Sequence, residues 1–431
     1  MVTIVKKVDK SGKEYTFLEN KVLVQNKLLK RATPENTYCT SPWNEIHIHA
    51  TGKVRMCCQH HGIDKNINDV TLSEAFNSDE YRTARKEVMS NIWPKGCGQC
   101  VKAESHSGFS MRYMNTELVN DAKRWHQTFG LPNTIQKIGI DFSNACNLRC
   151  TICDPNKSTG WYKDAKMLHN ALGEKESWRA YNHASDKPYG ISVDFVDKNL
   201  TTLLNAKHIE CGGGEPFYMP QFLYLVDKLI EHDYKGRLKI ITNATLLKEE
   251  MLEKLKNINA SFVVSMDGTG HVYPYMRPST PFGKYSWEEI EQKLFNIFDN
   301  YHLNISYTPN ILNIYNIPDY LEWLKHKLIP RKVNNVYTKD RFFNECVTSP
   351  NYLRIAVHPD EDYKHRLADM LEARSDGDHF SDIIMQCRKT RTDKEIDDWK
   401  FFCKTTDLLD KHRKTSIIKY VPKLEKYWIK E

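Results

Sequence analysis

Residues 141–155 read DFSNACNLRCTICDP and contain three cysteines, Cys146, Cys150 and Cys153, in a CxxxCxxC spacing. They follow a largely apolar run at residues 138–142, which we expect to be a strand, so the cysteines fall on the loop after it. Three thiolates on one short loop can converge on one soft metal centre, whereas disulfides would need pairs. A cubane cluster has four irons, so three cysteines leave one iron open, as a reactive centre requires.

A zinc site whose fourth ligand lies elsewhere in the chain is the alternative explanation of this triplet. The loop, however, resembles the CxxxCxxC motif that members of the radical SAM superfamily carry after the first strand of a partial α/β barrel. In that family S-adenosylmethionine chelates the open iron through its amino and carboxylate groups. Ile152 stands where the family usually has an aromatic residue beside the adenine, and the resemblance implies that it packs there.

The composition is that of a globular protein with room for more than one domain. The chain has 431 residues, of which 40% are hydrophobic and 27% charged. The N-terminus, MVTIVKKVDK, lacks the apolar segment of a signal peptide, and no apolar run approaches membrane-spanning length. We therefore expect a cytoplasmic protein without a membrane partner. In that reducing compartment, twelve cysteines favour metal binding over disulfides.

The net charge of the chain excludes few classes of function. The formal net charge is +7, and the segment from Arg388 onward has thirteen Lys and Arg against eight Asp and Glu. A basic face can bind nucleic acid or an acidic peptide, but a solvated helix surface is the commoner cause. A nucleic-acid partner is therefore not favoured.

A second cysteine pattern precedes the first one along the chain. A candidate hairpin (residues 45–49 and 54–57) has Cys39 and Cys57 near its outer ends, and a CxxC turn at Cys97 and Cys100 follows a helical stretch at 73–91. CxxC is the spacing that lets two thiolates from one turn bind one metal. Cys58 can replace Cys57 as the ligand, and a zinc site with four cysteines is the alternative to an iron–sulfur cluster.

The order of these residues, Cys39-x12-Gly52-x4-Cys57-x39-Cys97-x2-Cys100, resembles the twitch domain, the half-sized relative of the SPASM domain. The resemblance implies an auxiliary iron–sulfur cluster, 4Fe–4S in type, with Cys39, Cys57, Cys97 and Cys100 as its ligands. In the family this module usually follows the barrel, and here it precedes it. Because four cysteines complete the set, we interpret the neighbouring histidines as packing or surface residues; they are His47, His49, His60 and His61.

From residue 138 the pattern alternates between strands and amphipathic helices. The expected strands are residues 138–142, 208–211, 238–242, 262–266, 304–308 and 335–337, and the expected helices include 222–233, 246–256, 287–300 and 318–327. Such alternation predicts parallel βαβ units. The expected fold is α/β: a partial (β/α)6 barrel like that of radical SAM enzymes (111–340), after a twitch-like α+β domain (1–110) and before a mostly helical extension (341–431).

The second expected strand of the barrel ends in CGGGEP. Gly213 and Gly214 would leave backbone exposed at the strand end, where a side chain would block close approach. A phosphate-binding loop is the alternative interpretation of this segment, but the Gly-Lys-Ser/Thr sequence that ends such a loop is missing. Together with Glu215, the two glycines resemble the family's GGEP motif, which implies contact with the amino group of S-adenosylmethionine.

The next two strands also end in polar residues. The segment around Asn243, Thr-Asn-Ala, resembles the family's TNG motif, which implies contact with the ribose or methionyl part of the cofactor. Ser265 and Asp267, in Ser-Met-Asp-Gly, resemble the SxDG motif of peptide-modifying members, whose serine contacts the methionyl carboxylate. Arg277 follows shortly and is a candidate partner for that carboxylate.

The resemblance implies an oxidoreductase. A reduced cluster would cleave S-adenosylmethionine, and the 5′-deoxyadenosyl radical would take hydrogen from a peptide or protein side chain, with the auxiliary cluster as electron acceptor. A flavodoxin or ferredoxin would supply electrons. The alternatives are reaction on a small metabolite, modification of an RNA nucleoside, and, from another class, a zinc-stabilised nucleic-acid-binding protein. No residue stands out as a general acid or base.

Overall fold

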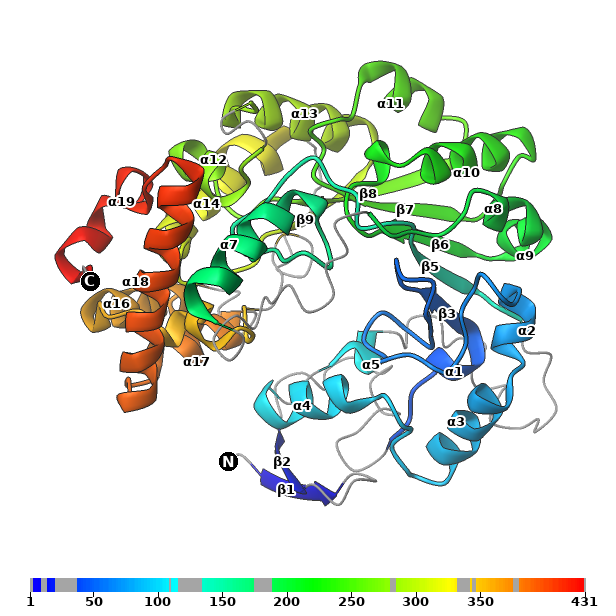
Figure 1. The fold of residues 1–431 in the computed structure, drawn as a ribbon, viewed down its shortest axis with the longest axis horizontal. Coiled ribbons are helices and arrows are strands. Elements are labelled where there is room, and N and C mark those ends of the chain that lie inside the picture. The colour runs from blue at the N-terminus through cyan, green and yellow to red at the C-terminus, as the bar shows by residue number, and fades with distance from the viewer. Residues whose placement is uncertain are drawn as a thin grey trace.

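The computed structural model (Figure 1) describes most of the chain, with several gaps. The described residues are 3–8, 14–19, 37–107, 110–114, 134–173, 188–279, 284–331, 342, 346–374 and 380–429. No helix among them is long and apolar enough to cross a membrane.

A seven-stranded sheet forms the centre of the molecule, in the order β4-β3-β5-β6-β7-β8-β9. Its strands are β3 (Glu45–Ile48), β4 (Val54–Arg55), β5 (Lys137–Asp141), β6 (His208–Gly212), β7 (Arg237–Thr242), β8 (Asn259–Ser265) and β9 (His302–Ser306). Every neighbouring pair is parallel except β3 with β4. The predicted α/β fold and the first five predicted barrel strands are confirmed, while the sixth, at 335–337, lies outside the described residues.

The unexpected member of this sheet is β3, which belongs by sequence to the N-terminal module. It pairs in parallel with β5, with Ile46 opposite Ile138 and Ile48 opposite Ile140. All four isoleucines are fully buried in one hydrophobic core. Burial of these side chains stabilises the junction, so the N-terminal module and the barrel share one sheet. The domain limits expected from the sequence stay a prediction.

Helices cover one face of the sheet, as Figure 1 shows for α10, α11 and α13. They are α8 (Asp194–Lys198), α9 (Leu200–Asn205), α10 (Pro220–Glu231), α11 (Glu249–Leu255), α13 (Trp287–Asn300) and α14 (Ile317–Trp323), and the last four confirm predicted helices. Alternate strand residues point into the core beneath them. On the opposite face, Glu210 and Lys239 point away from the helices, and their side chains are 16% and 39% exposed.

The N-terminal module adds short helices around β3 and β4. These are α1 (Ser41–Asn44), α2 (Leu72–Phe76), α3 (Asp79–Met89), α4 (Gly98–Ser107) and α5 (Met111–Met114), with β1 (Thr3–Val8) and β2 (Glu14–Glu19) in a separate antiparallel pair. The helix expected at 73–91 is two helices, because the chain breaks between Phe76 and Asp79. Thr71 and Glu74 form a capping box that begins α2.

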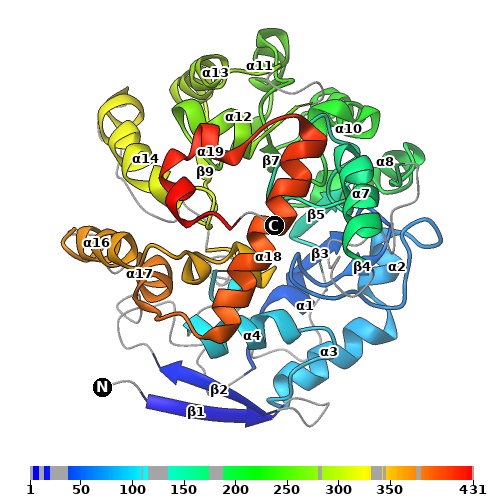
Figure 2. The ribbon, with the colours of Figure 1, turned by 60° about the vertical axis from the view of Figure 1, so that its left-hand side comes forward.

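The C-terminal extension is helical, as predicted. It comprises α16 (Glu361–Glu372), α17 (Ser381–Arg388), α18 (Asp393–Arg413) and α19 (Ile417–Tyr420). In Figures 1 and 2, α18 runs beside α7 (Tyr162–Leu172), the helix that follows the cysteine loop. Trp399 and Phe402 pack into one hydrophobic core, and Leu409 packs against Trp161 in another. These three residues of α18 therefore join two parts of the molecule.

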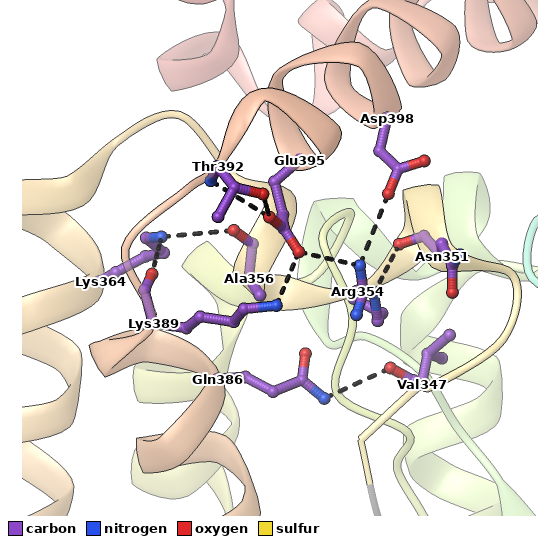
Figure 3. Close-up of polar contacts among 10 residues, drawn as sticks. All are labelled: Val347, Asn351, Arg354, Ala356, Lys364, Gln386, Lys389, Thr392, Glu395 and Asp398. Atoms are coloured by element: carbon purple, nitrogen blue, oxygen red, sulfur yellow. Dashed lines mark hydrogen bonds and ion pairs between the residues drawn. The ribbon is translucent and has the colours of Figure 1, made fainter.

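The beginning of α18 is held by the polar contacts drawn in Figure 3. The Glu395 carboxylate, 2% exposed, accepts hydrogen bonds from Arg354 (3.2 Å), Lys389 (2.7 Å) and Thr392. A buried carboxylate with this many donors is satisfied without solvent.

We predict that Gly139→Ala weakens the junction between β3 and β5. A Cβ atom at Gly139 would lie 2.1 Å from His47 Nδ1 on β3, so the ring must move. Overpacking of this kind costs about 1–3 kcal/mol and should lower the midpoint of thermal unfolding. His47→Ala in the same chain makes room and should recover part of the loss. A Gly139→Ala variant that melts like the wild type would contradict this packing.

Candidate functional site

The cysteine loop begins directly after β5 and is tied on one side to residues 275–279. Arg149 N donates to Pro278 O and Thr151 N to Met276 O, both at 2.9 Å, and Thr151 Oγ1 donates to Tyr275 O at 2.6 Å. Cys150 lies between the two paired residues and is buried. The backbone around Cys150 is therefore held by strand-like pairing across the barrel.

The other side of the loop is held by the residues that lead into α7. Thr159 N donates to Asn144 O (3.0 Å), Ser158 Oγ to Leu148 O, and the indole Nε1 of Trp161 to Cys150 O (2.8 Å). Trp161 is fully buried. These bonds satisfy loop carbonyls that would otherwise be buried without partners.

The GGEP segment at the end of β6 packs directly on the cysteine loop. Gly214 N donates to Ser143 O and Glu215 N to Ala145 O, both at 2.9 Å. A Cβ atom at Gly213, whose φ is +103°, would lie 2.5 Å from Ser143 O, and one at Gly214 would lie 2.1 Å from Ala145 O. Within the described chain, the close backbone approach that requires these glycines is therefore to the loop itself.

Glu215 is fully buried and links the ends of two neighbouring strands. Its carboxylate accepts hydrogen bonds from Thr242 Oγ1 (2.6 Å), Asn243 N (2.7 Å) and Phe217 N (3.2 Å). Burial raises the pKa of Glu215, against these hydrogen bonds, which lower it. The carboxylate thus orients Asn243 from β7 toward the loop.

Asn243 in turn lies against the first cysteine of the loop. Its Nδ2 donates to Asn147 Oδ1 (3.0 Å) and is 3.9 Å from Cys146 Sγ, while its Oδ1 accepts from Thr245. Asn147 was not singled out from the sequence, although it directly follows Cys146 in the motif. Ala244, which stands where the resembling motif has glycine, has a φ of +59°, in the left-handed region that favours glycine.

Asp267 and Arg277 form a buried ion pair beside Cys150. Arg277 Nη1 donates to Asp267 Oδ2 at 2.6 Å, and Asp267 Oδ1 accepts from Thr308 N at 3.2 Å. Arg277 Nε is buried and has no hydrogen-bond partner among the described residues. An unmatched guanidinium donor next to three cysteines fits an anionic group, such as a carboxylate or a thiolate-bound cluster. Ser265 is partly exposed at the end of β8, opposite Ser306.

The remaining candidate cofactor contact is Ile152, whose role beside the adenine stays a prediction. It is partly buried and packs against the hydrophobic core that includes Tyr275 and Met276 and the C-terminal residues Trp399 and Phe402. The extension therefore contributes to the surroundings of the loop.

The three thiols of the loop are electrostatic neighbours. Burial, and to a smaller extent the charge of the nearby Cys150, raises the pKa of Cys146 to about 12. Burial also raises the pKa of Cys150, while the charges of Arg277 and Arg413 lower it. Within the described part of the chain, no three His, Cys, Asp or Glu side chains are placed to hold one metal ion. In a cubane each cysteine binds a different iron, so the three sulfurs need not share one metal.

The second cysteine set surrounds a cavity in the N-terminal module. Cys39, Cys57, Cys97 and Cys100 all line it, whereas Cys58 is absent from its wall. The other lining residues are mostly apolar and include Met56, Val88 and Trp93. Burial raises the pKa of Cys58 to about 12, and its charged neighbours include Glu45, Lys137 and Glu210. The geometry thus favours Cys57 as the ligand and places Cys58 toward the sheet.

One histidine confirms the interpretation as a packing residue. His60 is 2% exposed; its Nδ1 accepts from Gly62 N and its Nε2 donates to Lys95 O, both at 2.9 Å. The ring thereby joins the Cys57 turn to the CxxC turn. A Cβ atom at Gly96, whose φ is +98°, would lie 2.5 Å from His60 Nε2, so the turn needs glycine there.

A buried ion pair beside the cavity was missed from the sequence. Arg112 and Glu104 are each 1% exposed, and Arg112 donates to both carboxylate oxygens, with Nη2 at 2.7 Å from Oε2. Arg112 lines the cavity, lies over the Trp93 ring at 5.2 Å and donates to Tyr38 O. The two partners are eight positions apart in the sequence, a spacing that gives no recognisable signal.

Comparison with known families identifies both modules. The radical SAM superfamily matches residues 140–324, and the iron–sulfur cluster-binding domain of the SPASM type matches residues 39–101. The chain therefore contains a radical SAM domain preceded by a SPASM-type domain, which confirms the resemblance and the unusual order. The cofactors of these domains are a 4Fe–4S cluster with S-adenosylmethionine, and auxiliary iron–sulfur clusters.

Individual relatives are distant. An uncharacterised protein of Methanocaldococcus jannaschii is 26% identical over 203 residues, which is 46% of this chain and 58% of the relative. Native anSMEcpe with bound AdoMet is 18% identical, with a TM-score of 0.37 over 54% of this chain and 58% of that one. SuiB of Streptococcus suis bound to S-adenosylmethionine is 14% identical, with a TM-score of 0.35 over 69% and 58%. The match thus spans less than two thirds of each of these proteins.

We predict that Gly214→Ala releases iron from the cysteine loop, because the new methyl group would displace Ala145. Iron content should fall from about eight to about four per chain. The matched control is Gly212→Ala, whose Cβ would lie no closer than 3.1 Å, to Asp141 Oδ1, and which should keep its iron. Equal iron contents in the two variants would contradict this account of the glycine.

Proposed function

We propose that the protein is a radical SAM enzyme whose catalytic 4Fe–4S cluster is held by Cys146, Cys150 and Cys153. The observation that carries the proposal is the convergence on one loop of the segments that follow three strands, β6, β7 and β8. Gly214 bonds to the loop, Asn243 lies against Cys146, and Arg277 presents an unmatched buried donor beside Cys150. This is the environment that an anionic cluster with an amino-acid-like ligand needs.

The chain's own residues would bind and orient the cofactor. Arg277 Nε and the Ser265 hydroxyl are the candidate partners for the methionyl carboxylate, and Asn243, oriented by Glu215, is the candidate contact for the ribose or methionyl part of the cofactor. Asp267 holds Arg277 in place, and Ile152 offers an apolar surface for the adenine. When bound and reduced, the cluster supplies the electron that cleaves S-adenosylmethionine to a hydrogen-abstracting 5′-deoxyadenosyl radical.

For the second site, we propose that Cys39, Cys57, Cys97 and Cys100 hold a closed 4Fe–4S cluster that accepts an electron in a net oxidation. Four thiolates leave no iron open to substrate. Sheet sharing supports the electron-acceptor role, because β3 of this module pairs directly with β5, the strand that leads into the catalytic loop. The substrate's second hydrogen would then leave as a proton.

The proposed substrate is a peptide or protein side chain, and the proposed reductant is a flavodoxin or ferredoxin in the cytoplasm. Support for a polar substrate comes from the inner face of the sheet. Glu210 and Lys239 remain partly exposed there, and Asn304 Oδ1 is buried without a hydrogen-bond partner in the described chain. Such groups can bond to peptide amides.

Replacing Cys146, Cys150 and Cys153 together by Ala should abolish reductive cleavage of S-adenosylmethionine, measured as 5′-deoxyadenosine by chromatography. About four irons should remain in the variant, bound at the N-terminal site. Formation of 5′-deoxyadenosine at the wild-type rate would disprove the assignment of the catalytic loop.

The variant Cys97→Ala with Cys100→Ala should still cleave S-adenosylmethionine but no longer yield oxidised product. Because metal binding often stabilises a small module, circular dichroism and about four irons at the catalytic loop must first show that the variant is folded. Unchanged product yield from the folded variant would mean that the reaction needs no electron acceptor at this site.

A further inference from the structure

A buried carboxylate connects the C-terminal extension to the helix that follows the cysteine loop. Asp164 on α7 is fully buried, and its Oδ2 accepts two hydrogen bonds from Arg413 at the end of α18, from Nη2 at 2.7 Å and from Nε at 3.1 Å. The Arg413 side chain is only 3% exposed. Such a pair, once formed, is costly to break on one side.

Two contacts connect the Asp164–Arg413 ion pair to the cysteine loop. Arg149, which lies between Cys146 and Cys150 in the motif, places Nη1 3.5 Å from Asp164 Oδ1. The Arg413 guanidinium also lies over the Trp161 ring at 4.8 Å, and Trp161 donates to Cys150 O. The end of α18 therefore touches the loop both through charge and through packing.

Two guanidinium groups, on Arg149 and Arg413, face the carboxylate of Asp164, and His412 Nε2 lies 3.5 Å from its Oδ1. A second buried carboxylate, Asp410, also lies within reach of the charge of Arg413. Arg413 is close enough for its charge to act on the Cys150 thiol, and Arg149 directly precedes Cys150 in the loop. A cluster gains one negative charge on reduction, so positive groups held this close to it favour its reduced form.

We propose that Arg413 and Asp164 are positioning residues of the catalytic cluster: the pair anchors the cysteine loop, and it holds the guanidinium groups of Arg413 and Arg149 close to the cluster, which makes the cluster easier to reduce. The inference rests on the proposed function, which assigns a 4Fe–4S cluster to Cys146, Cys150 and Cys153. It gives the C-terminal extension, which lies outside both matched domains, a role in the redox chemistry of the barrel.

The test compares Arg413→Met with Asp164→Asn in the full-length protein. Both variants break the same ion pair, so both should lower the midpoint of thermal unfolding. Their charges differ, however: loss of Arg413 should shift the reduction potential of the cluster to more negative values, and loss of Asp164 to less negative ones. The potential is measured by a redox titration followed by electron paramagnetic resonance, on the signal that changes when S-adenosylmethionine is added.

Two further variants separate charge from packing. Arg413→Lys keeps the charge and should return the potential close to that of the wild type. Arg354→Met removes an ion pair at the other end of α18, with Glu395 (Figure 3), and should lower thermal stability without moving the potential. If Arg413→Met cannot be loaded with iron at the loop while Arg354→Met can, the anchoring role is supported. The effect of charge is then tested by comparing the reduction potentials of Arg413→Lys and Asp164→Asn.

Equal potentials in Arg413→Met, Asp164→Asn and the wild type would overturn the inference, as would shifts of the same sign in both variants. A wild-type protein with no signal that responds to S-adenosylmethionine would instead overturn the assignment of the cluster, and the inference with it.

Discussion

The parallel pairing of β3 with β5 is the contact on which the arrangement of the two cysteine sites depends. It buries four isoleucines in one core and fixes the N-terminal module against the first strand of the barrel. The loop with Cys146, Cys150 and Cys153 begins where β5 ends, so this pair of strands connects the module that carries one cysteine set to the loop that carries the other. Because this junction is hydrophobic and hydrogen-bonded, it holds the module against the barrel more firmly than a linker would, which suits the electron exchange proposed between them.

Around the cysteine loop, backbone hydrogen bonds fix the position of the loop, and buried charges determine its electrostatic surroundings. Hydrogen bonds from residues 275–279, from GGEP and from the start of α7 hold the loop in place. Arg277 and Arg413 surround Cys150 with positive charge, although each also has a carboxylate partner. Burial alone would keep the thiols protonated, so these charges and the cluster's own irons must stabilise the thiolates.

Local patterns predicted much of this site. The spacing of the cysteines, the strand and helix periods and the residues at the strand ends depend on short stretches of sequence. Five of the expected barrel strands form within a few residues of their expected positions, whereas the helix expected at 73–91 is two helices and the strand expected at 335–337 lies outside the described residues. The β3–β5 junction could not be predicted, because the two strands are far apart in the chain and each is equally compatible with other partners. The Asp164–Arg413 pair spans 249 residues and has no local signal. The two glycines were recognised, but which backbone they approach requires the folded chain.

The most direct test of two clusters, one open and one closed, is a Mössbauer spectrum of the iron-57-enriched protein with and without S-adenosylmethionine. The structure predicts about eight irons, of which about one changes its environment when the cofactor binds, because only the three-cysteine loop leaves an iron without a protein ligand. No change on cofactor addition, changes at an iron of each cluster, or zinc in place of iron at either site would contradict the account.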